Sequence, residues 1–221
     1  MTARHLPALF LIGATLPGCL TASGERRPGS ADRPASAPDP QALVARLSPG
    51  PHHRHLDALA GRWESTVTVW PRPGADPNSS GGTSEVGWIL DGRWLRLDYR
   101  AADAGKGGVQ GLGLIGYDNV RQEHVFNWMD SVSCSALESS GRCADGGRTT
   151  EFAGTHGDPL TGERDLPFRW RCEIGRVGTV DAGTWSLELF EAAPGGEEFR
   201  KIRIVNTRAG ATAAAAQRTG G

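Results

Sequence analysis

The sequence lacks several features that mark common classes of protein. Neither sign of charge is in excess, since 24 Lys and Arg residues stand against 25 Asp and Glu residues for a net charge of -1, which argues against a nucleic-acid-binding protein. Long apolar runs are missing beyond the extreme N-terminus, so a polytopic membrane protein is excluded. Gly and Pro are abundant instead, with 31 and 14 residues among 221, and they indicate a chain with many turns.

Residues 1–19 have the pattern of an export signal. An eleven-residue apolar run at positions 6–16 is too short to span a bilayer and is typical of a signal peptide. It ends in Leu16-Pro17-Gly18-Cys19, which resembles the bacterial lipobox. The resemblance implies that Cys19 is lipidated and becomes the first residue of the mature protein. An ordinary cleaved signal is the alternative, although no Ala-x-Ala site follows.

The remaining chain divides by composition into three parts. Residues 20–51 are mostly small, polar or Pro and predict a disordered tether, in which residues 41–47 have room for two helical turns before Pro51. Residues 52–208 predict one folded domain, and residues 209–221 predict a disordered tail. We therefore expect a lipid-anchored protein of the bacterial cell envelope. In a Gram-negative cell it would lie at the outer membrane or the periplasmic face, and Leu20 favours outer-membrane sorting.

The folded domain is expected to be all-β. Segments rich in β-branched and aromatic residues alternate with Gly-, Asn- and Asp-containing turns, and Asp91-Gly92 predicts a tight hairpin. We expect strands at residues 63–70, 84–90, 93–99, 111–116, 124–130, 133–140, 149–153, 168–174, 184–190 and 198–207. Apolar residues at 168, 170, 172 and 174 alternate with charged ones, as in an antiparallel sheet with one face in solvent. About ten consecutive strands favour a single antiparallel up-and-down barrel, with a two-sheet sandwich as the alternative.

The segment 111–116, Gly-Leu-Gly-Leu-Ile-Gly, matches the pattern of a dinucleotide-binding loop. That site requires a helix after the glycines, but Tyr117-Asp118-Asn119 predicts a turn into another strand. The glycines are instead expected to let a strand bend or pack closely against another element.

Six short sequence motifs span nearly the whole folded unit: residues 55–63 (HLDALAGRW), 91–95 (DGRWL), 113–119 (GLIGYDN), 128–131 (WMDS), 158–163 (DPLTGE) and 206–208 (NTR). Together, and in this order, they resemble a bacterial family known as domain of unknown function 1579. The family name carries no activity, so the resemblance implies no catalytic residue.

Gly61-Arg62-Trp63 also resembles the Gly-x-Trp start of lipocalin-like (calycin) barrels. The resemblance implies that Trp63 closes one barrel end, that Arg208 on the last strand packs over its indole, and that the barrel holds a ligand cavity. Residues 55–60 would then form a short helical plug before the first strand, with Leu56 and Leu59 turned inward.

Seven Trp residues against two Tyr make an aromatic ligand cavity one interpretation, and ordinary core filling the other. The candidates for lining such a cavity share strand-like positions: Trp70, Trp88, Phe126, Trp128, Asp130 and Trp170.

The titratable residues give weak signals for chemistry. His52, His53 and His55 lie close together, but no further pair of ligands at suitable spacing predicts a metal site, and a capping or solvated cluster is favoured. His124 and Asp130 share a predicted strand, yet six residues of strand separate them by about 20 Å. Some calycin-like barrels hold haem through a His on a late strand, but residues 168–190 and 198–207 contain no His. The Gly-x-Ser-x-Gly pattern of a nucleophile elbow is also missing from the sequence. We therefore expect no cofactor, no metal and no catalytic residue.

Three cysteines remain after Cys19. An exported protein can form disulfides, and Cys134 and Cys143 could pair only if the chain turned near residues 139–141. Cys172 lies on an apolar face and is most simply a small buried hydrophobe.

Together these features lead to two hypotheses. The first is an exported lipoprotein whose barrel binds a small apolar or amphipathic ligand. The alternative is a structural or interaction lipoprotein that binds a partner through the Gly-rich loops at residues 71–83 and 101–110.

Overall fold

The computed structural model describes residues 39–159, 161–175, 183–192 and 196–210. The predicted signal peptide, most of the predicted tether and nearly all of the predicted tail therefore lie outside the described residues. Within these ranges, no helix is long and apolar enough to cross a membrane.

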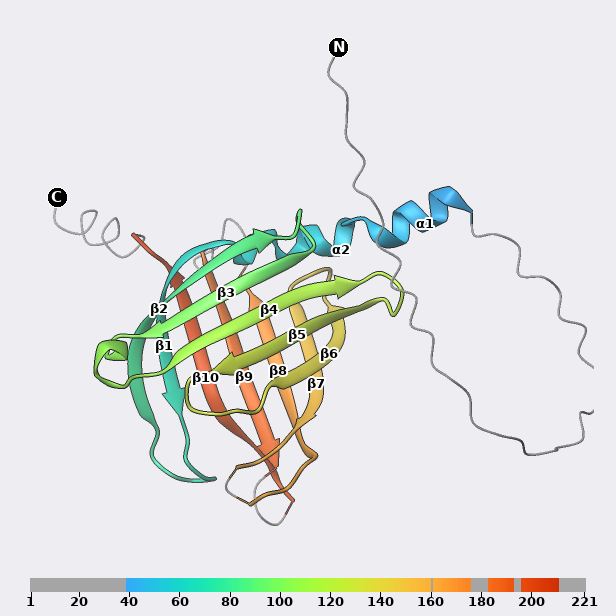
Figure 1. Ribbon diagram of the computed structural model, residues 1–221. Helices are drawn as coiled ribbons and strands as arrows, with labels where there is room; N and C mark the ends of the chain where they lie inside the picture. The colour runs from blue at the N-terminus through green and yellow to red at the C-terminus, as the bar shows by residue number, and fades with distance from the viewer. Residues whose placement is uncertain (1–38, 160, 176–182, 193–195, 211–221) are drawn as a thin grey trace, which may run out of the picture. The chain divides into compact units, whose positions relative to one another are not determined.

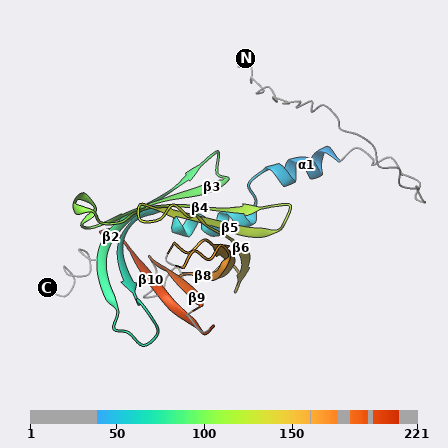
Figure 2. The same ribbon diagram turned by 60° about the horizontal axis from the view of Figure 1, so that its bottom comes forward.

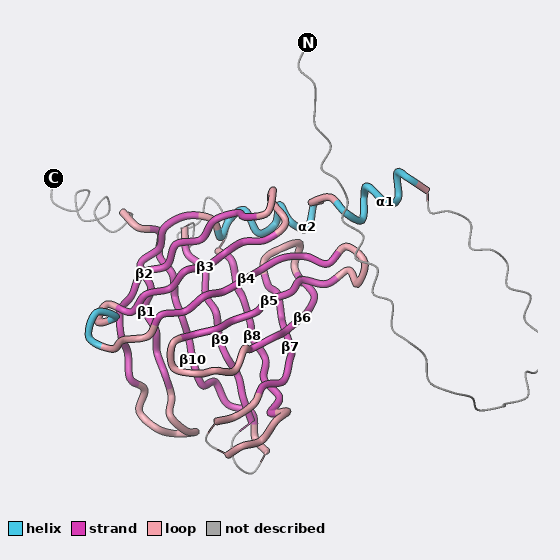
Figure 3. The backbone as a smooth tube through the Cα atoms, in the orientation of Figure 1, coloured by secondary structure: helices cyan, strands magenta, loops and turns pink. Residues whose placement is uncertain are grey.

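Ten antiparallel strands form a closed barrel, as predicted, and the two-sheet alternative is excluded. Each strand pairs with its neighbour in sequence, and β1 pairs with β10 to close the ring (Figures 1 and 3). In the turned view of Figure 2, β2, β10, β9 and β8 curve round beneath the layer of β3, β4 and β5. The strands are β1 (Gly61–Val69), β2 (Asn78–Ile89), β3 (Trp94–Ala101), β4 (Gln110–Asp118), β5 (Glu123–Asp130), β6 (Leu137–Ala144), β7 (Thr149–His156), β8 (Leu166–Ile174), β9 (Thr184–Ala192) and β10 (Glu198–Arg208).

A helical segment precedes the barrel, and its last part covers one barrel end (Figure 1). It consists of α1 (Pro40–Leu47), α2 (Pro51–Arg54) and the 3-10 helix η1 (His55–Leu59), so the end of the predicted tether is helical. Leu56 and Leu59 of η1 are buried in the core, and the indole N–H of Trp63 donates to the Leu59 carbonyl at 2.9 Å. The expected plug is thus fixed to the first strand.

The two ends of the barrel sequence meet at this same plug. Trp63 on β1 is paired in register with Arg208 on β10, and the Arg208 guanidinium lies over the indole at 4.3 Å from its centroid. Gly61 adopts φ 137°, and a Cβ at this position would lie 2.5 Å from Nη1 of Arg208. The Gly-x-Trp start therefore works together with the final Arg, because glycine makes room for the guanidinium.

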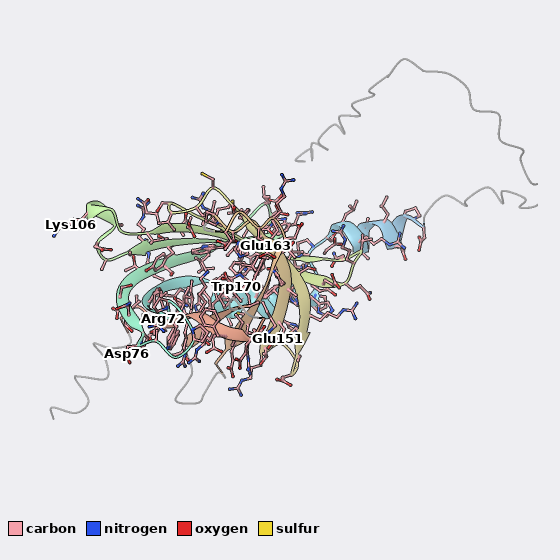
Figure 4. All side chains as sticks on the ribbon, turned by 90° about the horizontal axis from the view of Figure 1, so that it is seen from below. Arg72, Asp76, Lys106, Glu151, Glu163 and Trp170 are labelled. Atoms are coloured by element: carbon pink, nitrogen blue, oxygen red, sulfur yellow. The ribbon has the colours of Figure 1, made fainter. Side chains whose placement is uncertain are left out.

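A band of aromatic and aliphatic side chains fills the interior. Phe168, Trp170 and Cys172 on β8 point inward, while the intervening Arg169 and Arg171 lie on the outer face, as the alternation predicted. Trp170 lies within the ring of strands, whereas Asp76 and Lys106 lie at its periphery (Figure 4). The barrel core is therefore continuous from the plug toward the opposite end.

Strands β6 and β2 differ most from the predicted ranges. Strand β6 begins at Leu137 rather than at residue 133, and residues 139–141 are part of this strand instead of a turn. A Cβ on Gly141 would collide with the Glu151 carbonyl of β7, so close pairing between strands fixes this segment rather than its own alternation. Strand β2 begins at Asn78, so the predicted loop 71–83 is shorter than expected.

The glycines of residues 111–116 lie in β4, and a turn and β5 follow them, so no dinucleotide-binding helix is present there. Aromatic side chains pack against these glycines. The Trp128 ring lies against Gly111, and the Phe126 ring lies against Gly113. A Cβ on Gly116 would be 2.7 Å from the Trp94 ring. The expected close packing accounts for this glycine pattern.

Candidate functional site

The barrel interior holds no ligand-sized space among the described residues that line it. The two internal cavities have volumes of about 10 Å³ each. A space of this size accommodates roughly one water molecule. Phe126, Trp128 and Trp170, three of the expected cavity residues, are buried core side chains, and Phe126 packs edge-on against Trp170 at 5.6 Å. Large aromatics fill the volume that the lipocalin resemblance assigned to a ligand.

The other expected cavity residues have structural contacts of their own. The Trp88 indole N–H donates to Asp57 at 2.8 Å and ties the plug to β2, while the Trp70 ring lies under the Arg200 guanidinium at 4.5 Å. Asp130 accepts the Trp128 indole N–H at 3.1 Å and the backbone N–H groups of two residues in the following turn. None of these three side chains shares a binding space with the others.

An open cleft of about 450 Å³ lies instead at the barrel end beside the plug, and we call it the histidine cleft. Its walls come from the helical segment, the end of β4, the start of β5 and the β6–β7 connection. The lining residues are His52, His55, Tyr117, Gln122, His124, Arg142, Cys143, Gly146 and Gly147. Its volume is within the range of small-molecule sites.

Three rings form the centre of the histidine cleft. His52 of α2 stacks on Tyr117 of β4 with centroids 4.3 Å apart and planes at 17°. His124 of β5 presents an edge contact to Tyr117 at 4.9 Å and lies 6.2 Å from His52. Strand pairing fixes this arrangement, because Tyr117 and His124 are directly opposite each other in the β4–β5 ladder.

His124 forms the floor of the cleft and is only 1% exposed. Burial lowers its pKa to about 4, an effect opposed by the nearby backbone of His52 and strengthened by the neighbouring histidines. Apart from that backbone group, neither ring nitrogen has a hydrogen-bond partner of normal geometry. The imidazole is therefore neutral at pH 7, with hydrogen-bonding capacity left over.

His53 has a different role from its two neighbours. It is buried, and its Nδ1 accepts the backbone N–H of Gly50 at 3.1 Å, which caps the short helix α2. Its pKa is lowered, first by burial and then by the charges of His52 and Arg93. The capping interpretation of the cluster thus applies to His53, while His52 and His55 face the cleft. No group of three or more His, Cys, Asp or Glu in the described ranges is arranged to hold a metal ion.

The rim of the histidine cleft carries one cation and one thiol. Arg142 is largely exposed and lies 3.7 Å from Glu123. The Cys143 Sγ–H donates to the Ala144 carbonyl at 3.2 Å, and Cys143 is free, as are Cys134 and Cys172. Because residues 139–141 do not turn, the one route considered for pairing Cys134 with Cys143 is closed. Cys172 is buried, which raises its pKa to about 12 and keeps the thiol protonated.

The structure separates some of the candidate residues and brings others together. His124 and Asp130 lie near opposite ends of β5, so they form no acid–base pair. The sequence drew attention to His52, His55 and His124 but did not bring them together, and it did not single out Tyr117 or Arg142. The order of the elements could have indicated this site, because the plug covers the barrel end at which β4 ends and β5 begins.

Comparisons with known proteins identify a family for this chain. A family model described as "Protein of unknown function (DUF1579)" matches residues 48–208. The comparison with curated proteins gives no match. Among solved structures, the chain is similar to the one described as "Crystal Structure of Rv2717c from M. tuberculosis", with 16% identity, coverage of 73% of this chain and 99% of that chain, and a TM-score of 0.49.

Proposed function

Because the chain belongs to the DUF1579 family of proteins of unknown function, its role has to be argued from its own residues, and we propose that it is an exported lipoprotein that binds a small amphipathic molecule in the histidine cleft. The ligand has a flat apolar ring and an anionic group. This proposal moves the expected ligand from the filled interior to the open barrel end.

The observation that carries the proposal is the stacked pair of His52 and Tyr117 within a cleft of about 450 Å³. Flat side chains at the wall of an open cleft offer π-faces on which a planar ligand stacks at low entropic cost. Arg142 on the rim supplies a guanidinium that suits a carboxylate or a similar anion. The combination selects for a molecule with both features.

His124 adds a polar group to the floor. Its neutral ring carries one N–H and one acceptor nitrogen, and neither nitrogen has a side-chain hydrogen-bond partner of normal geometry among the described residues. A ligand that reaches the floor of the cleft would gain a hydrogen bond to a ring nitrogen that has already lost its hydration in the folded protein.

The lipoprotein part of the proposal is supported by the sequence. The apolar run at residues 6–16 and the following Leu16-Pro17-Gly18-Cys19 fit export and lipidation at Cys19. One acyl chain gives marginal membrane binding and two or more give stable anchoring. The binding cleft would then act in the cell envelope.

Titration of the purified chain with 2-naphthoate, followed by calorimetry, tests ligand binding. We expect saturable binding, and Arg142→Gln should weaken it by about tenfold through loss of a charge-assisted contact. Tyr117→Leu should weaken it similarly by removing the stacking face.

The matched control is Arg121→Gln. Arg121 and Arg142 are equally exposed and have similar carboxylate partners, at 3.5 Å from Asp118 and 3.7 Å from Glu123, but Arg121 does not line the cleft. Equal losses in the two arginine variants, or no saturable binding by the wild-type protein, would contradict the proposal.

A second candidate is an interaction protein whose barrel is a scaffold for loops, and the filled interior is the observation in its favour. Of the two loops considered, residues 78–83 belong to strand β2 and residues 104–106 form a 3-10 turn, η2 (Ala104–Lys106). Replacing residues 71–77 and 102–109 with Gly-Ser sequences should abolish partner binding if this candidate holds. The same replacement should leave 2-naphthoate binding unchanged.

A further inference from the structure

We propose that the barrel end bearing α1 docks on the bilayer surface through five exposed aliphatic side chains, an inference that rests on the proposed lipid anchor. These residues, which we call the aliphatic face, are Leu43, Val44, Leu47, Leu90 and Val120. Their side chains would enter the boundary between headgroups and acyl chains, and the histidine cleft would face the membrane-proximal space.

Helix α1 has the character of an interfacial helix. Leu43 and Leu47 are one turn apart and Val44 adjoins them, so the three lie on one side of the helix. Leu43 is 43% exposed and both Val44 and Leu47 are 62% exposed, and no residue of α1 is buried. A helix whose apolar side is left in water while Arg46 occupies its polar side is typical of elements that lie in the membrane interface.

The tips of two hairpins extend the face beside α1. Leu90 lies in the β2–β3 turn and is 66% exposed, and Val120 lies in the β4–β5 turn and is 75% exposed. Large aliphatic residues at loop tips are unusual, since turn positions favour small and polar residues. Figure 1 shows α1 and the β4–β5 tip at the same side of the barrel.

Hydrogen bonds hold these three elements as one unit. The Asn119 side-chain amide donates to the carbonyls of Ala45, Arg46 and Ser48, at 2.8 Å for the last. Arg93 of the other hairpin donates to the Leu47 carbonyl at 3.1 Å. The aliphatic face is thus built from a helix and two turns that are tied together through the end of α1.

The position of the anchor identifies the bilayer as the occupant. Helix α1 begins directly after Asp39, and only residues 20–38 separate it from Cys19. Fully extended, that segment reaches roughly 65 Å at most, so an acylated Cys19 would keep the barrel close to the membrane, and α1 is the described element nearest to the anchor along the chain. Three arginines belong to the same elements, Arg46, Arg93 and Arg121, and their long side chains can bury their stems while the charge stays among the headgroups.

Val132 provides a comparison at another site. It is 70% exposed, in the turn after β5, whereas Val120 precedes β5. The two valines therefore lie at opposite ends of the same strand, with similar exposure, and only Val120 belongs to the aliphatic face.

The test attaches an environment-sensitive fluorophore (NBD) to Val120→Cys or to Val132→Cys in the full lipidated protein. Cys134→Ser and Cys143→Ser remove the accessible thiols, and Cys172 is buried. The labelled proteins are reconstituted in vesicles of phosphatidylethanolamine and phosphatidylglycerol at a ratio of 3:1, with or without brominated acyl chains. We expect the brominated lipid to quench the probe at position 120 at least twofold more than at position 132, and Leu43→Glu with Leu47→Glu to remove the difference.

Equal quenching at the two positions would overturn the proposal, as would a difference that survives the two Glu substitutions. A probe at position 120 that responds to protein concentration in detergent, but not to brominated lipid, would identify a second copy of the chain as the occupant and would also overturn it. Intact mass of the N-terminal peptide reports separately on the anchor, and 2-naphthoate binding reports separately on the cleft. Failure of the docking proposal is therefore distinguishable from failure of the proposed function.

Discussion

The Arg208 guanidinium lies 4.3 Å above the indole centroid of Trp63, and the two residues face each other across the β1–β10 pair that closes the barrel. Each residue also contacts the plug: Trp63 donates to the Leu59 carbonyl at 2.9 Å, and Arg208 donates to the Ala60 carbonyl at 3.4 Å. The same pair of side chains therefore contributes both to barrel closure and to the attachment of the plug.

Arg208→Ala should lower the free energy of unfolding by about 1 kcal/mol, since it removes the cation–π contact and the packing of the guanidinium on the ring. Urea denaturation provides the measurement. Arg62→Ala serves as a control, because the Arg62 side chain is 78% exposed and lies 3.6 Å from Glu85 on the outer surface. A change of less than about 0.5 kcal/mol is expected there, and equal effects of the two substitutions would contradict the special role of Arg208.

Gly61→Ala should lower the free energy of unfolding by about 2 kcal/mol or more, because Gly61 has φ 137° and an added Cβ would lie 2.5 Å from the Arg208 guanidinium. Gly81→Ala is the matched substitution on the adjacent strand, where no atom lies within 4 Å of an added Cβ. Thermal unfolding of both variants should show a lower Tm for the first and little change for the second. A Gly61→Ala protein as stable as wild type would show that this glycine is not needed for closure.

The protein should lose stability in acid because of His124. Its pKa is about 4 in the folded protein and near 6.5 in an unfolded chain, so the unfolded state binds more protons between these values. The stabilisation is complete above pH 6.5 and is lost as the pH falls toward 4. The expected loss between pH 7.5 and pH 4.5 is about 2–3 kcal/mol in the free energy of unfolding.

His124→Phe keeps a flat buried ring and removes the titrating group, so it should make the pH dependence shallower. His53 also has a lowered pKa and leaves a smaller dependence of the same sign. Denaturation curves of the wild-type protein and of His124→Phe at the two pH values provide the comparison. An unchanged slope in His124→Phe would assign the acid sensitivity to other groups.

Cys19→Ser should abolish acylation and release the protein from the membrane fraction, since the lipobox-like residues 16–19 place the anchor on this thiol. Mass spectrometry of the N-terminal peptide and fractionation of the cells give the two readouts. Wild-type protein that carries no acyl mass, or variant protein that stays with the membrane to the same extent, would refute the lipoprotein prediction.

The barrel could be predicted because its signals are local. Alternation such as that of residues 168–174 and turns such as that after Asp118 report strand and hairpin directly. Strand β6 was misplaced because its sequence, with Ser139, Ser140 and Gly141, has no alternation, and its position depends on pairing with β7. Pairing partners are a property of the closed sheet and cannot be read from one segment.

The site could be predicted only in part, for a similar reason. His52 and His124 are distant in sequence and meet because the plug covers the barrel end where β4 and β5 are joined. The interior cavities are too small for the expected ligand. Residue types such as Trp170 and Phe126 suit both a lined cavity and a filled core, and the packing of all ten strands decides between the two.

The barrel interior is filled by core side chains, and we propose that the histidine cleft binds the ligand. The most direct measurement is an NMR titration of the full mature protein with 2-naphthoate, in which histidine imidazole and tryptophan indole signals are followed together. The account predicts that the signals of His52, His55 and His124 shift with saturation while the indole N–H signals of the buried Trp170 and Trp185 do not. Shifts of the two buried indoles with unchanged histidines would place the ligand inside the barrel and contradict the account, and so would the absence of any shift at millimolar probe.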